Sequence, residues 1–146
     1  MSEEAITRQL VVFSLGEEEY ALPIADVHEI IRYTEPRSVA SSVDWVRGVI
    51  SLRGKIVPVY DLASRLGCAR CEDVSEQKIV IVEAAAQLAG VVVDDVEEVI
   101  TVDADRLERL PAADEASIDS IVKLDDRLIV LLSPAGLFGL SAEIAA

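Results

Sequence analysis

VDWVRGVISLRGKIVPVYDLASRLG, residues 43–67, is the stretch that decides the fold. It contains two apolar runs, 48–52 and 55–60, on either side of the dipeptide Arg53-Gly54. A glycine at the second position of a tight turn can adopt the positive φ that a two-residue hairpin requires. This stretch therefore predicts a β-hairpin.

A short helix is predicted directly after this hairpin. Asp61 stands at the N-cap position, where a carboxylate can accept a hydrogen bond from a free backbone N–H group. Leu62 and Leu66 are one helical turn apart, and Gly67 can adopt the left-handed conformation that ends a helix. The predicted order is hairpin, short helix and stop.

The same order of elements returns in the last third of the chain. When KIVPVYDLASRLG, residues 55–67, is aligned with RLIVLLSPAGLFG, residues 127–139, the apolar positions and the final glycines match. Asp61 aligns with Ser133, another N-cap residue type, and Pro134 follows at the first helical position, where its missing N–H group costs nothing. These matches favour a duplication over a coincidence between two apolar runs.

A second pair of segments supports the duplication. YALPIADVHEII, residues 20–31, aligns with AGVVVDDVEEVI, residues 89–100, and the matched pairs are Asp26 with Asp95, Val27 with Val96, Glu29 with Glu98, and Ile31 with Ile100. We therefore interpret residues 1–146 as a single domain made of two copies, approximately 9–69 and 77–140. Each copy is small for an independent core, so the copies are predicted to share an interface.

The remaining elements are also predicted to be short strands. Further hairpins are expected over 9–15 with 20–24, over 78–83 with 88–93, and over 118–124 with 127–132. After Ile24 we expect a short turn and another strand, and over 103–110 a short helix ended by Pro111. Many short strands, tight turns and few aromatic residues predict an all-β fold of two compact barrels.

Trp45 is the only tryptophan in the chain. We interpret it as a core anchor at the end of a barrel rather than a ligand-stacking residue, because nothing basic or aromatic surrounds it. The prediction is a packing role.

Composition limits the possible partners and location. The chain has 146 residues, 51% hydrophobic residues and a formal net charge of -14. This charge argues against nucleic acid or an anionic membrane surface as a partner. The apolar runs are far shorter than the roughly 20 residues of a membrane helix. The first ten residues include two acidic residues and no apolar core, unlike a signal peptide, so we expect a cytoplasmic protein without direct membrane insertion.

The two cysteines, Cys68 and Cys71, form a lone C-x-x-C motif. A structural zinc site needs two further ligands, and the single histidine, His28, supplies one at most, so no metal is predicted. Two reduced loop thiols are the favoured interpretation, and a small thiol or redox switch that uses both cysteines is the alternative.

No set of residues points to catalysis. The sequence has one histidine and lacks a G-x-S-x-G motif, a phosphate-binding G-K-[ST] loop and a G-x-G-x-x-G motif. Its many carboxylates are typical of a solvated surface. We therefore expect a binding protein rather than an enzyme, with no cofactor.

Several motifs together resemble a known family. F-S-L-G-x-x-x-Y-A-L-P-I, V-x-E-I-I, W-V-R-G-V-I-S-L-R-G-K-I-V-P-V-x-D-L, G-V-V-V-D-x-V and L-D-D-R-L-I-V-L-L follow one another in this order. Their order resembles that of the CheW family of chemotaxis coupling proteins over about residues 9–139. The resemblance implies a fold of two tandem five-stranded SH3-like β-barrel subdomains packed side by side, with a few short helices.

The resemblance also implies a function. It predicts a scaffold that couples the cytoplasmic tips of chemoreceptors (methyl-accepting chemotaxis proteins) to the regulatory domain of the CheA histidine kinase, with other CheW-like modules as further partners in array rings. It places the protein in the cytoplasm, recruited to membrane-associated receptor arrays. Flagellar chemotaxis and another chemosensory output, such as surface motility, both remain open as the pathway.

The positions that match the receptor-contact motif of the family are Val27, Glu29, Ile30, Gly48 and Arg53. The resemblance implies that the receptor lies in an apolar groove between the barrels and that Glu29 and Arg53 form a charge couple beside it. Val27 and Ile30 also fit ordinary core packing. Gly48 fits either a backbone requirement or the close approach of a receptor helix.

Two positions depart from the expected pattern, and the kinase contacts stay unassigned. Ser120 stands in the second copy where the first has Gly48, and His28 lies inside the V-x-E motif, where it is either an ordinary exposed residue or an influence on partner choice. No residue is assigned to the kinase from motif alone. The hairpin tip at 125–127 and the strands of the second copy are candidates.

Overall fold

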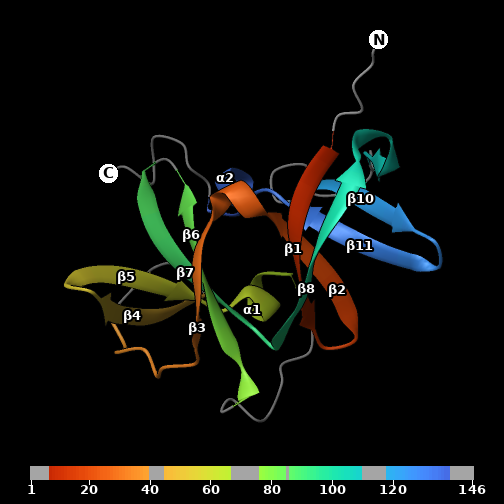
Figure 1. Ribbon diagram of the computed structural model, residues 1–146. Coiled ribbons are helices and arrows are strands. Elements are labelled where there is room, and N and C mark those ends of the chain that lie inside the picture. Colours follow the sequence, from red (N-terminus) through yellow and green to blue (C-terminus); the bar gives the residue numbers. More distant parts are fainter. Residues whose placement is uncertain (1–6, 40–44, 67–75, 85, 110–117, 139–146) are drawn as a thin grey trace.

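The computed structural model describes residues 7–39, 45–66, 76–84, 86–109 and 118–138, which form two β-sheets (Figure 1). The six-stranded sheet has the order β8-β1-β2-β11-β10-β9, with bounds β1 Thr7–Leu15, β2 Glu18–Pro23, β8 Asp95–Asp103, β9 Leu107–Glu108, β10 Ile118–Leu124 and β11 Arg127–Leu132. The five-stranded sheet has the order β3-β6-β7-β5-β4, with bounds β3 Val27–Arg32, β4 Val46–Leu52, β5 Lys55–Tyr60, β6 Lys78–Ala84 and β7 Gln87–Val93. The predicted all-β fold is confirmed.

The two sheets do not coincide with the two sequence copies, which corrects the expected assignment of 9–69 and 77–140 to separate barrels. The third strand of each copy pairs with the first strand of the other copy, β3 with β6 and β8 with β1. One sheet, with its helix α1, is therefore the continuous segment 27–93, here called subdomain B. The other combines 7–23 with 95–138 and is called subdomain A.

Short helical segments accompany the strands in the parts of the chain that the structure describes. They include the 3₁₀ turns η1 (Ile24–Asp26) and η3 (Ala104–Arg106) and the helices α1 (Leu62–Leu66) and α2 (Pro134–Leu137). Both predicted N-caps are present, because Asp61 Oδ1 accepts from Ser64 N–H at 3.3 Å and Ser133 Oγ accepts from Gly136 N–H at 3.2 Å. The predicted stops, Gly67 and Gly139, lie outside the described residues.

The prediction of a helix over 103–110 is wrong. The chain makes one 3₁₀ turn and then enters β9, where Leu107 pairs with Val122 of β10. An extended backbone brings Leu107 against the core of subdomain A. Tertiary packing here outweighs the local helical signal.

Among the residues that the structure describes, the apolar interior has three parts. One cluster fills subdomain A and includes Leu10, Val12 and Ile129, and a second fills subdomain B and includes Val57 and Ile79. The third, which we call the seam cluster, takes buried side chains from both sheets: Phe13, Leu15, Tyr20, Leu22, Leu62, Ala63, Val80, Val82, Ala89, Val91, Val93, Leu132, Leu137 and Phe138. The expected shared interface is therefore a packed apolar core.

Trp45 packs against the seam cluster, as predicted for a core anchor. The expectation that no basic or aromatic side chain surrounds it is wrong. Its ring lies 4.6 Å from that of Tyr60 and 5.7 Å from that of Phe138, and the Arg65 guanidinium lies 5.9 Å from it. Aromatic and basic neighbours thus surround Trp45, supplied by segments distant in the sequence. Burial in this cluster raises the pKa of the Tyr60 hydroxyl.

Asp94 marks one of the two places where the chain crosses between the subdomains; the other is η1. Its Oδ2 accepts from Gly16 N–H at 2.6 Å in the β1–β2 turn, and its Oδ1 accepts from Gln77 Nε2 at 3.2 Å. Asp94 N–H also donates to Ser14 O at 3.0 Å. One side chain thereby ties the turn of subdomain A to the start of β6 in subdomain B.

Replacing Asp94 by alanine is expected to lower the free energy of unfolding by about 1–3 kcal/mol, because Gly16 N–H and the Gln77 amide lose a charged acceptor. Urea titration followed by circular dichroism measures the change. Asp95→Ala serves as the control, since its exposed side chain makes only a 3.6 Å ion pair with Lys78, which is worth little, and a local hydrogen bond from the adjacent Val96 N–H. Equal losses in both variants would contradict the assigned role of Asp94.

Candidate functional site

The register of β3 on β6 places the sequence-predicted apolar residues on the face that meets subdomain A. Val27 and Ile30 lie opposite Val82 and Val80, which belong to the seam cluster. A β-bulge between Val27 and Glu29 makes this common placement possible, because it adds one residue to the strand. The predicted contact residues Val27 and Ile30 therefore share the seam side of β3.

Glu29 lies on the other side of the same strand. It pairs with Ile81, whose side chain belongs to the core of subdomain B, and Ile31 pairs with Ile79 in the same core. The five predicted site residues thus do not form one cluster. Val27 and Ile30 face the seam, whereas Glu29, Gly48 and Arg53 belong to the barrel of subdomain B.

The second wall of the seam is built in the same way from β8, and sequence reasoning missed it. Val96 lies opposite Phe13 of β1, and Val99 lies opposite Val11. A β-bulge interrupts this pairing between Val12 and Phe13. Val96 packs against the seam cluster, as Val27 does, while Val99 is 52% exposed and Ile30 is 41% exposed. The internal repeat already contained this signal, because it aligns Val27 with Val96 and, one step further, Ile30 with Val99.

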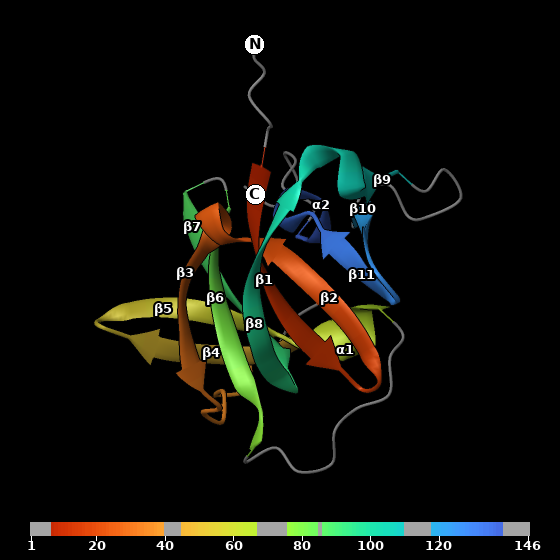
Figure 2. The same cartoon turned by 45° about the vertical axis from the view of Figure 1, so that its right-hand side comes forward.

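We call the apolar residues Ile24, Val27, Ile30 and Val99, which lie along the seam, the seam face. Ile24 of η1 is 38% exposed. Figures 1 and 2 show β3 and β8 on either side of the seam, running in opposite directions. Beside Ile24 lies an open hollow of about 530 Å³, lined by Thr7, Arg8, Gln9, Pro23, Ile24, Ala25 and Thr101. Apolar side chains from both subdomains are therefore available to a partner along this line.

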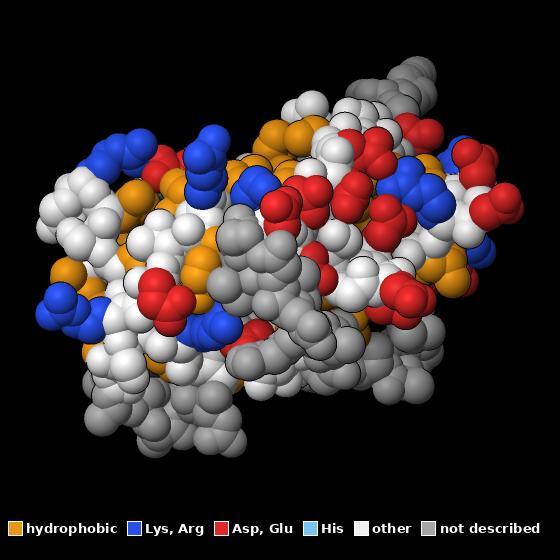
Figure 3. All heavy atoms as spheres, turned by 90° about the horizontal axis from the view of Figure 1, so that it is seen from below, with side chains coloured by type: hydrophobic (Ala, Val, Ile, Leu, Met, Phe, Trp, Pro, Cys, Tyr) orange, Lys and Arg blue, Asp and Glu red, His pale blue; other side chains and the backbone are white. Residues whose placement is uncertain are grey.

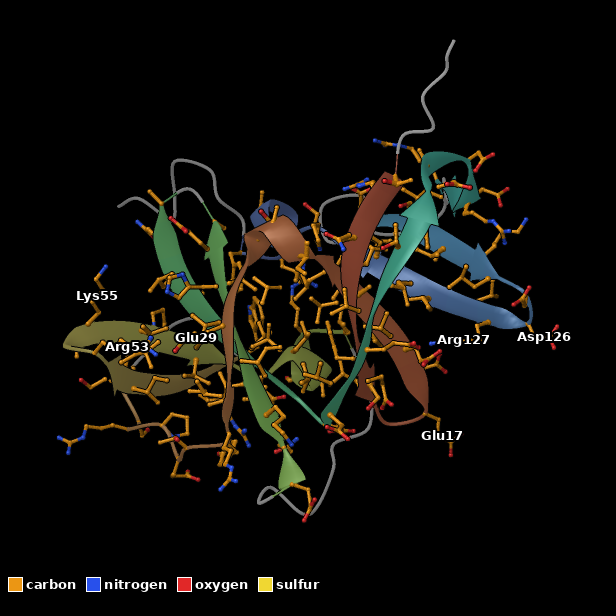
Figure 4. The ribbon with its side chains drawn as sticks, viewed as in Figure 1. Glu17, Glu29, Arg53, Lys55, Asp126 and Arg127 are labelled. Atoms are coloured by element: carbon orange, nitrogen blue, oxygen red, sulfur yellow. The ribbon has the colours of Figure 1, made fainter. Side chains whose placement is uncertain are left out.

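The predicted charge couple is present. Arg53 Nη1 donates to Glu29 Oε1 at 2.6 Å, and the two side chains project toward each other in Figure 4. The side chain of Arg53 is 72% exposed and that of Glu29 is 21% exposed. β3 and β4 are the two edges of this sheet, so the couple connects edge strand β3 to the turn of the β4–β5 hairpin. Its geometry fits positioning of that hairpin rather than stabilisation of the fold.

Gly48 is required by the backbone of subdomain B itself. Its φ is +149°, and a Cβ atom would collide with the carbonyl group of Arg37, 2.7 Å from its carbon atom. Arg37 lies this close because it forms a bridge to Val49 through N–O hydrogen bonds of 2.8 and 2.9 Å. Gly48 is buried, so a structural reason exists for its missing side chain. The close approach of a receptor helix at Gly48 stays a prediction.

A second ion couple lies in subdomain A, and its arginine, Arg127, aligns in the repeat with Lys55 rather than with Arg53. Arg127 makes two hydrogen bonds to Glu19, at 3.1 and 3.0 Å, and one to Glu98 at 2.8 Å. Hydrogen bonding to Glu19, and then to Glu98, raises the pKa of Arg127 well above its usual range. The repeat aligns Glu98 with Glu29, so both barrels join their third strand to a hairpin through a Glu–Arg pair.

The described part of the chain offers no group of three or more His, Cys, Asp or Glu side chains that could hold a metal ion. None of its helices has the length and apolar character needed to span a bilayer. Cys68 and Cys71, on which the thiol-switch alternative depends, lie outside the described residues. The described geometry is a set of partly exposed apolar side chains along the seam, with an ion couple in each subdomain.

Comparison with known proteins agrees with this geometry. A family model described as a CheW-like domain matches residues 9–141. The chain is 30% identical to the probable chemotaxis protein CheW of Rhizobium etli, over 95% of this chain and 92% of that protein. It is 32% identical to the chemotaxis protein CheW of Bacillus subtilis, over 85% of this chain and 82% of that protein.

A crystal structure of the scaffolding protein TtCheW from Thermoanaerobacter tengcongensis superposes with a TM-score of 0.84 at 38% identity, covering 91% of this chain and 93% of that one. This likeness confirms the predicted class of two SH3-like subdomains, with β9 as an additional short strand. By sequence, fold and the match over most of its length, this chain belongs to the CheW-like family.

Proposed function

We propose that this protein is a non-catalytic adaptor that couples chemoreceptor signalling tips to the CheA histidine kinase in a chemosensory array. The observation that carries the proposal is the seam face, where Ile24, Ile30 and Val99 stay 38–52% exposed beside a tightly packed interior. An apolar strip on a soluble surface commonly marks a protein-binding site. The relatives named as chemotaxis and scaffolding proteins support this role.

The receptor tip is a helical hairpin, and a helix of this kind presents an apolar ridge along one side. Laid along the seam, this ridge contacts Val27 and Ile30 of one wall and Val99 of the other, in the manner of a helix in a groove. The strip is narrow, so a single contact of this kind is weak. Assembly into an array compensates, because several weak links act together through effective concentration.

The best direct test combines receptor binding with substitution of exposed apolar residues. Ile30→Ser and Val99→Ser are each expected to weaken binding of a purified chemoreceptor cytoplasmic hairpin by about tenfold, because each removes an apolar contact from one wall. Isothermal titration calorimetry measures the affinity. Leu128→Ser is the matched control, since Leu128 is 67% exposed but lies in β11, away from β3 and β8. Normal receptor binding by both seam variants would refute the proposed site.

Glu29 and Arg53 are proposed to hold the β4–β5 hairpin in position for the receptor. In a double-mutant cycle, Glu29→Ala and Arg53→Ala are expected to weaken receptor binding to a similar extent and non-additively, while changing the free energy of unfolding by only about 0–1 kcal/mol. Calorimetric binding and urea unfolding provide the two measurements. Additive losses of receptor affinity would show that the two side chains act separately.

Binding of the regulatory domain of the kinase is proposed for a different surface, because the receptor takes the seam. The hairpin tip at 125–127, where Asp125 and Asp126 are exposed, projects from subdomain A at the far end of the molecule (Figure 4). Other CheW-like modules are further partners in array rings, and the protein is proposed to act in the cytoplasm at membrane-associated arrays. Pull-down with the C-terminal domain of CheA, compared between the native chain and Asp126→Lys, tests the kinase surface.

A further inference from the structure

The two walls of the seam, β3 and β8, are built alike, so their apolar residues alone do not set the direction of a helical rod bound between them. Each wall has a packed valine, an exposed apolar residue two positions beyond a bulge, and a Glu–Arg couple behind it. β3 and β8 run in opposite directions (Figure 2), so the two walls present these features in opposite order along the seam. A rod with one apolar ridge could make the same apolar contacts in either of two opposite directions.

The ion couples are where this symmetry fails. In subdomain B, Arg53 contacts Glu29, and its side chain stays 72% exposed. In subdomain A, Arg127 is only 38% exposed and is held by two carboxylates, Glu19 and Glu98. The repeat aligns Glu19 with Leu88, so subdomain B lacks this additional carboxylate. Subdomain B therefore offers an accessible cation behind its wall, and subdomain A carries an excess of negative charge behind the other wall.

The charges of the two subdomains differ in the same sense. Among the described residues, subdomain B has seven basic and five acidic side chains, whereas subdomain A has five basic and twelve acidic ones. Figure 3 shows acidic side chains gathered over subdomain A and basic ones prominent over subdomain B. The asymmetry at the couples is thus reinforced by the fields of the whole subdomains.

We propose that this unequal charge fixes the direction in which a helical rod docks on the seam face. The inference rests on the proposed function and adds the chemistry of the partner: an apolar ridge with acidic side chains along one flank and basic side chains along the other. The acidic flank faces subdomain B, where Arg53 is exposed, and the basic flank faces subdomain A, where Glu19 and Glu98 outnumber Arg127. Turning the rod around would bring like charges together, which selects one direction by repulsion as well as attraction.

Orientation can be measured independently of affinity. A nitroxide spin label is attached at one end of a purified chemoreceptor cytoplasmic hairpin, and line broadening is recorded on backbone amides of the full-length protein. One direction broadens amides near Ile24, in the turn η1 that precedes β3, and the other broadens those near Arg32, at the end of β3. For the native chain, broadening is expected at one end of the seam only.

The test variant removes the asymmetry at both couples. Arg53→Met combined with Glu19→Leu takes one charge from each wall and leaves the net charge unchanged. It is expected to weaken hairpin binding about threefold to tenfold and to broaden amides at both ends of the seam. The matched control is Lys55→Met with Glu17→Leu, which removes the same charges from turn positions farther out (Figure 4). The control is expected to keep one-sided broadening.

The outcomes separate the two ideas. A hairpin that does not bind the native chain at all refutes the proposed function, and this inference with it. A hairpin that binds the native chain in both directions equally refutes only the inference. The inference also fails if the Arg53→Met, Glu19→Leu variant keeps one-sided broadening. Loss of one-sided broadening in the control would likewise refute the role of the two couples.

Discussion

Replacing Gly48 by alanine is expected to lower the free energy of unfolding by about 2–4 kcal/mol. The backbone at this position has φ +149°, a conformation that residues with a side chain rarely adopt. The added Cβ would also meet the carbonyl of Arg37, which is fixed by its bridge to Val49. Strain and collision therefore act together, and the bridge is expected to open. Urea unfolding measures the loss.

The control for this substitution is Gly54→Ala. Gly54 also has a positive φ, +82°, but a Cβ there would meet nothing within 4 Å. It is expected to cost only about 1 kcal/mol, which isolates the contribution of strain from that of the collision. A Gly48→Ala protein as stable as the native one would show that the segment around Arg37 yields easily. In that case, reduced receptor binding would have to arise from a direct clash with the receptor.

Replacing Phe13 by alanine is expected to destabilise both subdomains together, by about 3–5 kcal/mol. Phe13 is fully buried in subdomain A, yet it belongs to the seam cluster, which also contains Val80 and Val91 of subdomain B. The cavity therefore removes contacts from both sheets. A single cooperative transition at lower urea concentration is the expected result, because neither half has a large core of its own.

Hydrogen exchange read separately for the two sheets provides the measurement. In Phe13→Ala, protection is expected to fall by the same free energy in β1 and in β6. Trp45 fluorescence and circular dichroism should report the same midpoint, since Trp45 packs at the seam. Val57→Ala, in the core of subdomain B alone, is the comparison. If only the amides of subdomain A lost protection in Phe13→Ala, the subdomains would be independent folding units.

Much of the fold could be predicted because its signals are local. The central hairpin follows from Arg53-Gly54, which adopt φ +51° and +82°, and both short helices follow from the capping side chains of Asp61 and Ser133. Turns and caps are set by a few neighbouring residues, so a single sequence is enough to recognise them. The Glu29–Arg53 contact was implied by family resemblance and is present.

The exchange of third strands could not be predicted because strand pairing is non-local. β3 and β8 have the same pattern in both copies, and nothing within either copy says which first strand each will join. The same limit explains Trp45, whose neighbours Tyr60 and Phe138 come from other segments. Val99, in contrast, could have been predicted from the sequence, because the repeat aligns it with Ile30. Applying the family motif to the second copy as well would have placed the other wall.

The crossing of the chain between subdomains has a consequence for biosynthesis. Subdomain B is one continuous segment, 27–93, so the ribosome completes it while β8 to β11 of subdomain A are still missing. During that interval β1 and β2 have no partners on their outer edges, and apolar residues such as Leu10 and Val12 remain uncovered. The nascent amino-terminal hairpin is thus the part of this molecule with the greatest need of a chaperone during translation.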